Sequence, residues 1–196
     1  MYRPEQRQIS FECTRCGTCC RHRDLIVTVT ATDIDRLSTG LGLDSSMLLR
    51  ALDFYVLSEG MSPPIGLRHI PQVLTESGPA YVALRKLPSG ECVFLQGDLC
   101  MIYDLRPDAC RIFPFVFDTD RYQEDGLNPL YALCPGLGRG PAMDLSDVVP
   151  IVTESLVNFR EYCALVRQWN EAEISHTASG FIKFVLSARV FPEQQP

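Results

Sequence analysis

Eight of the nine cysteines in this chain occur at spacings that suit metal ligation by thiolates. Cys13, Cys16 and Cys19 follow one another at two-residue separations, and Cys20 is adjacent to the third. This spacing lets a short loop point successive sulfur atoms at one metal ion or cluster, and Gly17 supplies the bend. Cysteines that only fill space in a core have no reason to recur in this way. The candidate metal ligands are Cys13, Cys16, Cys19, Cys20, Cys92, Cys100, Cys110 and Cys134.

The pattern leaves open how many sites there are and which metal they hold. Neighbouring side chains diverge, so we expect one of Cys19 and Cys20 to serve a second site or to stay unligated. Eight thiols could fill two four-ligand sites, or one such site with spare thiols. The compact triplet favours an iron-sulfur cluster, of the 4Fe-4S type, over two zinc sites, because zinc knuckles more often pair Cys-x-x-Cys units. A single zinc or iron ion stays open as an alternative.

Basic side chains are expected near such a centre. A zinc ion or an oxidised 4Fe-4S cluster held by four thiolates carries about two net negative charges. Arginines could balance this charge, or each could form a surface ion pair. If the centre is catalytic, a pocket beside it could receive an anionic substrate or the carboxylate of S-adenosylmethionine. The arginines that flank the cysteines are Arg15, Arg21, Arg23, Arg106 and Arg111, and the residues predicted to bind a cofactor are Arg106, Arg111, Gly136 and Gly138.

The composition is that of an ordinary folded protein, with 196 residues of which 46% are hydrophobic and 21% are charged. A formal net charge of -6 argues against broad binding to nucleic acid or to an anionic membrane. No secretory signal is apparent and no apolar run approaches about 18 residues, so we expect a cytoplasmic protein that does not enter membranes. Because cytosolic thiols are kept reduced, clustered cysteines there favour metal binding or redox chemistry over disulfides.

The pattern along the chain predicts an α+β fold, namely a small irregular single domain organised around the metal centre. It would contain short strands, a hairpin and an amphipathic helix near the C-terminus. We expect an N-terminal arm at 1–10 and a metal-binding domain at 11–140. Residues 58–79 would form a loop insertion in that domain, and residues 141–196 a helical extension that packs on it.

Local signals place the individual elements. Residues Thr30 to Asp33 read as a capping box that starts a helix. Pro107 suits the start of a short helix that carries Cys110. The predicted strands are 25–29, 81–87 and 92–95, with a turn at 96–98 that returns the chain through 99–103. The predicted helices are 30–41, 45–57 and 147–169, the last with an apolar face of Ile151, Leu156, Phe159, Cys163 and Val166, while 181–191 could be helix or strand.

Several residues near the cysteines are expected to shape the site without ligating metal. Cys163 is predicted to pack in the core, and the glycine-rich segment 136–140 is predicted to be a turn that positions Cys134. His22 could be a ligand, but it is expected to lie beside the site or to be exposed. The residues predicted to form an apolar wall that shields the centre from solvent are Tyr103, Phe113, Pro114, Phe115 and Phe117.

Five blocks of the sequence, taken in order, resemble a known family. They are Phe11-Glu-Cys-Thr-Arg-Cys-Gly-Thr-Cys-Cys20, Cys92-Val-Phe-Leu95, Gly97-Asp-Leu-Cys-Met-Ile-Tyr103, Arg106-Pro-Asp-Ala-Cys-Arg-Ile-Phe-Pro-Phe115 and Cys134-Pro-Gly136. The resemblance is to the YkgJ-type cysteine-cluster proteins, which are named for their CxxCxxCC motif and described as zinc- or iron-chelating domains. The family's usual Cys-Pro at the hairpin reads Cys92-Val here. The resemblance implies a metal site made by the eight cysteines.

The resemblance says less about a reaction than about a metal. A longer relative, the flagellin lysine methylase, resembles this domain and is linked to an iron-sulfur cluster and S-adenosylmethionine. The leading hypothesis is therefore a metal-binding protein with a redox or cluster-assisted enzymatic role of the methyl-transfer type, acting with a protein partner or protein substrate. The alternatives are a non-enzymatic zinc module that mediates protein interaction, and a metal delivery protein. Fold and metal motif do not decide between them.

Overall fold

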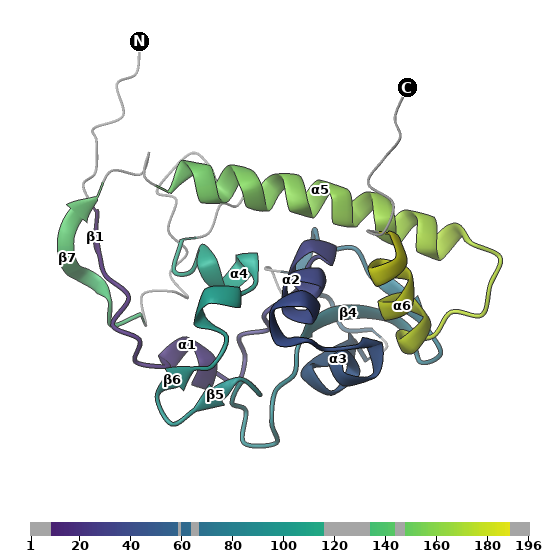
Figure 1. Ribbon diagram of the computed structural model, residues 1–196, viewed down its shortest axis with the longest axis horizontal. Coiled ribbons are helices and arrows are strands. Elements are labelled where there is room, and N and C mark those ends of the chain that lie inside the picture. Colours follow the sequence, from purple (N-terminus) through teal and green to yellow (C-terminus); the bar gives the residue numbers. More distant parts are fainter. Residues whose placement is uncertain (1–8, 59, 64–66, 116–133, 144–147, 189–196) are drawn as a thin grey trace, which may run out of the picture.

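The computed structural model describes residues 9–58, 60–63, 67–115, 134–143 and 148–188. The long helix α5 (Val149–Glu171) runs along two groups of elements (Figure 1). One group is a three-stranded sheet with helices α2, α3 and α6, and the other holds the short elements that carry the cysteines. The predicted α+β class is therefore confirmed. None of the described helices is long and apolar enough to cross a membrane.

The three-stranded sheet is antiparallel, with β4 (Gly78–Leu84) between β2 (Leu52–Val56) and β3 (Val73–Thr75). The segment predicted as a strand at 25–29 forms only an isolated bridge, between Thr28 and Ala83. Its backbone still pairs with β4 on both sides of that bridge, through hydrogen bonds at Val27 and Val29. This pairing carries the chain from the first cysteines directly onto the sheet.

Two predictions around the sheet were wrong. Helix α3 (Ser45–Ala51) ends where β2 begins and does not continue to residue 57. Phe54, Tyr55 and Val56 are aromatic or β-branched, and pairing with β4 fixes them as a strand. The predicted loop 58–79 is also shorter than expected, because β3 and the first residues of β4 lie within it.

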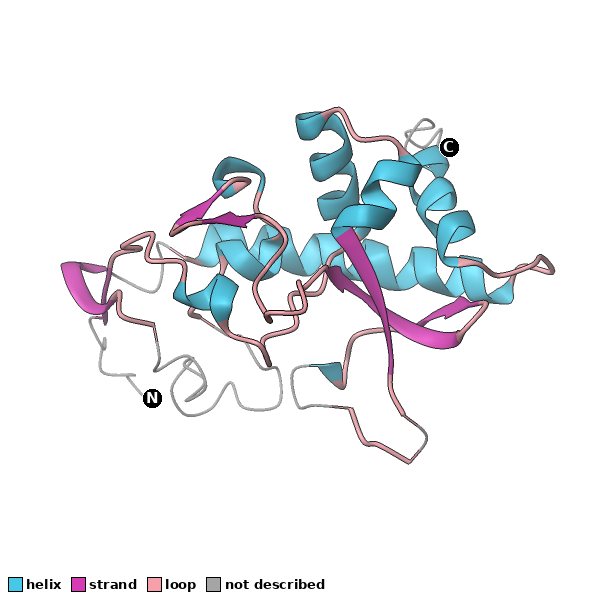
Figure 2. Cartoon of the chain, turned by 90° about the horizontal axis from the view of Figure 1, so that it is seen from below, coloured by secondary structure: helices cyan, strands magenta, loops and turns pink. Residues whose placement is uncertain are grey.

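Helices α2 (Ala31–Leu41) and α6 (Ala178–Ala188) complete the main core, with α3 beside them (Figure 2). The predicted capping box at the start of α2 is confirmed, because Thr30 and Asp33 bond to each other's backbone N–H groups. Helix α2 ends at Gly42, whose φ of 64° is the left-handed conformation that favours glycine. The sequence left residues 181–191 open as helix or strand. The described part of this segment is helical through Ala188, and Phe181 on it is fully buried.

Helix α5 has nearly the predicted bounds but a different buried face. The prediction placed Leu156 and Cys163 on that face, whereas Leu156 is 42% exposed and Cys163 is only partly buried. From Asn158 onward the buried positions recur every three to four residues, but they include a polar side chain that hydropathy alone could not assign. They are Val152, Asn158, Tyr162, Val166 and Trp169.

The remaining strands surround the cysteines. The predicted hairpin is confirmed but short, with β5 (Leu95–Gln96) and β6 (Leu99–Cys100) joined by a two-residue turn at 97–98. The predicted strand 92–95 is reduced to a bridge between Cys92 and Lys86 and the first residue of β5. The glycine-rich segment predicted as a turn is mostly strand β7 (Leu137–Met143), which pairs with β1 (Ile9–Phe11).

A buried ionic network attaches the cysteine-bearing part to the main core. Asp108, which begins the short helix α4 (Asp108–Arg111), is 3% exposed. Its carboxylate accepts hydrogen bonds from Arg36 of α2 at 3.1 Å, from Arg111 at 3.1 Å and from Asn158 of α5 at 2.6 Å. Burial and the nearby Asp108 charge raise the pKa of Asp33, whose carboxylate accepts the backbone N–H of Asp108. Helices α2, α4 and α5 therefore meet at one satisfied polar cluster.

Replacing Asp108 with alanine should lower the free energy of unfolding by about 3 kcal/mol, because it removes the buried carboxylate that accepts hydrogen bonds from Arg36, Arg111 and Asn158. This loss of stability is at the low end of the range for breaking a buried ion pair, since the side chains of Arg36 and Arg111 are 20% and 29% exposed. Urea unfolding followed by circular dichroism measures the change. The matched control is Asp104→Ala, at an exposed site four residues earlier, which should change stability by less than about 0.5 kcal/mol. Equal effects of the two substitutions would contradict this account of the network.

Candidate metal centre

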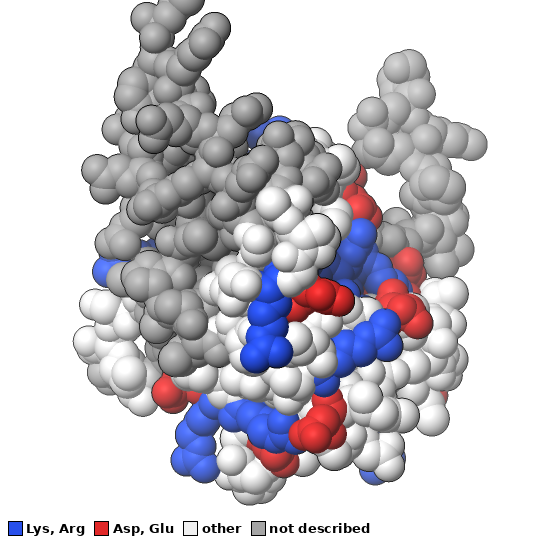
Figure 3. Space-filling model, turned by 90° about the vertical axis from the view of Figure 1, so that its left-hand side faces the viewer, with Lys and Arg blue, Asp and Glu red and all other residues white. Residues whose placement is uncertain are grey.

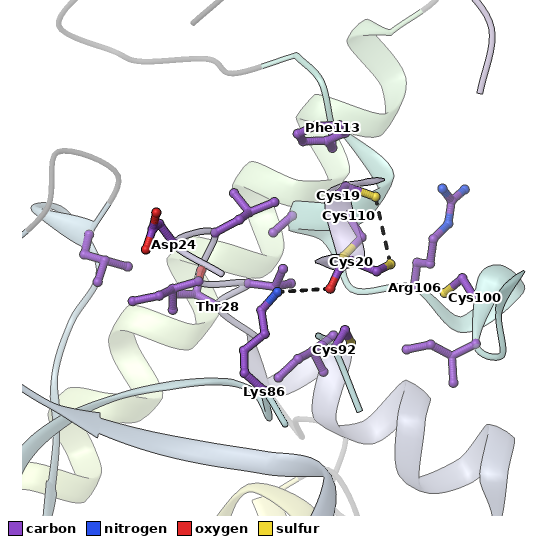
Figure 4. A pocket seen from close by; sticks show the side chains of 17 residues that line it. Cys19, Cys20, Asp24, Thr28, Lys86, Cys92, Cys100, Arg106, Cys110 and Phe113 are labelled. Atoms are coloured by element: carbon purple, nitrogen blue, oxygen red, sulfur yellow. Dashed lines mark hydrogen bonds between the residues drawn. The ribbon is translucent and has the colours of Figure 1, made fainter. Parts of the chain in front are cut away.

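A cavity of about 220 Å³ lies among the cysteine-bearing segments (Figure 4). It is lined by residues of helices α1 (Thr18–Arg21) and α4, of the hairpin, and of the extended segment 24–28 that pairs with β4. Five of the eight candidate ligands line this one cavity, from four segments of the chain. They are Cys19, Cys20, Cys92, Cys100 and Cys110.

The first two of these thiols are positioned by a sharp reversal of the chain. Arg15 and Gly17 both adopt left-handed backbone conformations, with φ of 53° and 68°, and Gly17 leads directly into α1. A side chain at Gly17 would also crowd the Asp98 carbonyl of the hairpin turn. We expected Cys19 and Cys20 to diverge, but both line the cavity and their sulfur atoms lie 3.9 Å apart.

Cys100 reaches the cavity because side chains alternate along an extended strand. Leu99 and Met101 on either side of it are 60% and 58% exposed, whereas Ile102 is 2% exposed. The same alternation that sends Leu99 and Met101 to solvent therefore turns Cys100 inward. Cys92 is held by its backbone N–H, which donates to the Cys20 carbonyl at 2.8 Å.

The thiols of Cys19, Cys20 and Cys100 form one hydrogen-bonded group. The hydrogen bond from Cys20 lowers the pKa of Cys19 to about 7 and that of Cys100 to about 6. The pKa of Cys20 itself is raised, because its proton is shared with these two neighbours. Thiolate is the form that binds metal, so two of the three sulfur atoms are prepared for ligation.

The other two cavity thiols are more deeply placed. Burial raises the pKa of Cys92 and raises that of Cys110 well above its ordinary value, and neighbouring thiols add to both rises. A buried thiol of this kind ionises only when a cation or a metal compensates the charge. The cavity therefore favours a metal over free thiolates.

The remaining cysteines lie outside the cavity wall. Burial raises the pKa of Cys134, and the Cys16 and Cys19 charges raise it further. Cys13 is exposed. Cys163 lies in a separate groove between α5 and β3, which corrects the prediction that it packs in the core.

Two cations line the cavity, namely Lys86 and Arg106. The Arg106 guanidinium lies over the Tyr103 ring, 3.7 Å from its centroid, and donates to the Tyr103 carbonyl at 2.8 Å. Its charge helps to lower the pKa of Cys100. Sequence reasoning missed Lys86. The one feature of the sequence that distinguishes this residue is composition, since Lys86 and Lys183 are the two lysines among 18 basic residues.

The other predicted basic residues are used differently. Arg111 forms ion pairs with Asp108 and Glu154, and Arg21 forms ion pairs with Asp98 and Glu91. Arg23 donates to the Pro88 carbonyl, and the Arg15 guanidinium lies 4.1 Å from the Tyr103 ring centroid. Basic and acidic side chains are interspersed over the described part of the face shown in Figure 3.

The four residues predicted to bind a cofactor are not brought to one cavity. Arg106 lines the thiol cavity, whereas Arg111, Gly136 and Gly138 do not. Gly136 has a structural requirement of its own, because a side chain there would overlap the carbonyl oxygen of Glu12 where the chain approaches β1. Gly138 has a left-handed φ of 77° within β7.

The rest of the cavity wall is mainly apolar. Phe113 lines it as predicted, together with buried aliphatic residues from the main core. Phe115 packs instead in a second apolar cluster with Val148 and Val152, and Phe117 lies outside the described residues. The aliphatic residues of the wall are Leu25, Ile26, Val27, Leu67, Leu84, Ile102 and Ala109.

The donor set suits a soft metal, because thiolates select zinc, copper(I) and iron-sulfur clusters. Within the described residues, no three His, Cys, Asp or Glu side chains already converge closely enough to hold a single metal ion. The five thiols thus surround a space and do not meet at a point. The residues present fit a thiolate-bound metal group.

The comparisons with known proteins agree with this chemistry. The family model described as "CxxCxxCC: Putative zinc- or iron-chelating domain" matches residues 12–135, a range that contains all eight candidate ligands and excludes Cys163. Comparisons with curated proteins and with solved structures found no match. The family match extends over more than half of the 196 residues. The chain therefore belongs to the CxxCxxCC family of zinc- or iron-chelating domains.

Proposed function

We propose that the cavity holds a thiolate-bound iron-sulfur cluster and that the protein uses it in redox or cluster-assisted chemistry. The observation that carries this proposal is that five thiols line one cavity of about 220 Å³ without converging on a point. A single zinc ion with bonds of about 2.3 Å would draw four sulfur atoms to about 3.8 Å from one another. A cluster of several atoms fills a larger space and accepts thiolates from around it.

The surroundings of the thiols support a cluster. Cluster potentials depend on net charge, hydrogen bonds to sulfur and exposure to solvent. Lys86 and Arg106 offset negative charge at the wall, and Phe113, Ile102 and Leu84 limit contact with water. We also propose that 11–140 is the metal-binding domain and 141–196 an extension that packs on it, and contacts of α5 with α4 and α2 support this arrangement. A cytoplasmic location would keep the thiols reduced.

An enzymatic role in methyl transfer is a further part of this proposal, beyond metal binding. Methyl transfer from S-adenosylmethionine rests on the sequence resemblance, and Arg106 is the one predicted binding residue that lines the cavity. A protein substrate would have to approach the hairpin side, where Leu99 and Met101 are exposed beside Cys100.

A structural zinc module is the second candidate, and one distance favours it. The Cys19 and Cys20 sulfur atoms are 3.9 Å apart, close to the separation of about 3.8 Å that tetrahedral zinc ligation requires. A zinc ion bound there would join α1 to the hairpin through Cys100, which is hydrogen-bonded to Cys20. Such a module would offer a surface to a partner and perform no reaction.

Metal analysis of protein purified without air separates these candidates. We expect a coloured protein with broad visible absorption, and iron and sulfide in equal amounts per chain, because a cluster contains both. Exposure to air should bleach it. A colourless protein that contains zinc and no sulfide would reject the cluster and support the zinc module.

Substitution of single cysteines tests whether the cavity is the site. Cys100→Ser should lower the metal bound per chain, because it removes one of the low-pKa thiols at the cavity. Cys163→Ser is the matched control, since Cys163 is partly exposed in a separate groove, and it should leave metal content unchanged. Metal and sulfide are measured for each variant alongside circular dichroism. Full metal content in Cys100→Ser would exclude that thiol from the centre.

A further inference from the structure

We infer that Lys86 is the built-in counter-cation of the thiolate centre, a positioning residue that sets how tightly the centre is bound and how easily it is reduced. This inference rests on the proposed metal function and names a residue outside the CxxCxxCC motif. Lys86 follows β4, and its backbone forms a bridge with Cys92. The backbone register therefore brings this side chain to the thiol cavity.

The ammonium group is held by two carbonyls of the first cysteine segment. Lys86 Nζ donates to the His22 carbonyl at 3.1 Å and to the Cys20 carbonyl at 3.4 Å. These carbonyls lie at the C-terminal end of α1, where a cation is favoured. The Cys20 carbonyl also accepts the Cys92 backbone N–H at 2.8 Å, so one oxygen atom joins the segments that carry Cys20, Cys92 and Lys86. Figure 4 shows Lys86 beside this carbonyl and the cavity thiols.

The charge of Lys86 has no carboxylate to neutralise it among the ion pairs of the described residues, in contrast with Arg21, Arg36 and Arg111. Asp24 also lines the cavity, but Figure 4 shows it at the opposite end of the cavity from the thiols. Four thiolates around zinc or an oxidised cluster leave about two net negative charges, which are costly in an apolar cavity. A cation fixed at the wall lowers that cost.

Lysine suits this role better than arginine. Its ammonium is a compact charge on a flexible stem, whereas a planar guanidinium prefers paired carboxylates or an aromatic face, as Arg106 has with Tyr103. In a chain with 18 basic residues, one of the two lysines lies here and the other, Lys183, is exposed on α6. That second lysine provides a matched control.

Metal titration of four variants tests the inference. Cobalt(II), which reports thiolate ligation by its absorption, is titrated into reduced protein and then competed with zinc. Lys86→Met and Lys86→Gln should weaken binding by about 10- to 100-fold, the usual effect of removing a partner beyond the direct ligands. Lys86→Arg should retain most of the affinity, and Lys183→Met should match the wild type. Circular dichroism of the metal-free variants should be unchanged, which separates a loss of charge from a loss of structure.

A second readout depends on charge alone. In protein that carries a cluster, Lys86→Gln should shift the reduction potential to more negative values, because the added electron loses a compensating charge, and Lys86→Arg should restore it. Unchanged cobalt affinity in both Lys86→Met and Lys86→Gln would overturn the inference and leave the metal function intact. A wild-type protein that takes up neither cobalt nor a cluster would overturn both.

Discussion

The cost of placing negative charge on thiols inside an apolar cavity is the constraint on which the cysteine-bearing part of this structure depends. Five thiols line a space whose other walls are mainly apolar, and burial is the largest cause of the raised pKa values of Cys92 and Cys110. Thiolates at such positions require compensation by metal, by hydrogen bonds or by cations. The chain itself provides two cations, Arg106 and Lys86, and a hydrogen bond from the Cys20 thiol, and each of these lowers the pKa of a cavity cysteine.

The same constraint explains why the cysteine segments are anchored individually. The Cys92 backbone N–H donates to the Cys20 carbonyl. After Cys20 the chain pairs with β4 at residues 27–29, and Cys92 itself forms a bridge with Lys86, just beyond β4. Cys110 lies on α4, which Asp108 ties to α2 and α5 through charged hydrogen bonds. Each anchor uses polar groups that are satisfied within the described residues, so the thiols are held by several independent attachments.

Local signals in the sequence were enough to predict some of these elements. The capping box at Thr30 and Asp33, the proline before α4 and the turn at Gly97 act within a few residues, and all three appear in the structure. The cysteine spacing likewise predicted a metal-binding family, and the family match confirms it.

Other features depend on partners far away in the sequence. The strand preference of Phe54, Tyr55 and Val56 was not enough to separate residues 52–56 from the preceding helix in the sequence, and pairing with β4 fixes them as a strand. The pairing of β1 with β7 joins segments more than 120 residues apart, which no local pattern encodes. Asn158 is buried and donates to Asp108, so at this position a polar contact and not hydropathy sets the buried face of α5. The position of Lys86 also depends on tertiary pairing, since its backbone bridge with Cys92 brings it to the thiols.

The extent of the core bears on what the metal is for. Classical zinc modules are unfolded without metal because they have little else to bury. Here Ile34, Leu48, Val82 and Phe181 are buried to 1% exposure or less in a core that joins the sheet to helices α2, α3, α5 and α6. A chain of this length buries enough apolar surface to fold without a metal staple. The proposed thiolate centre is therefore attached to a fold that has a large apolar core of its own.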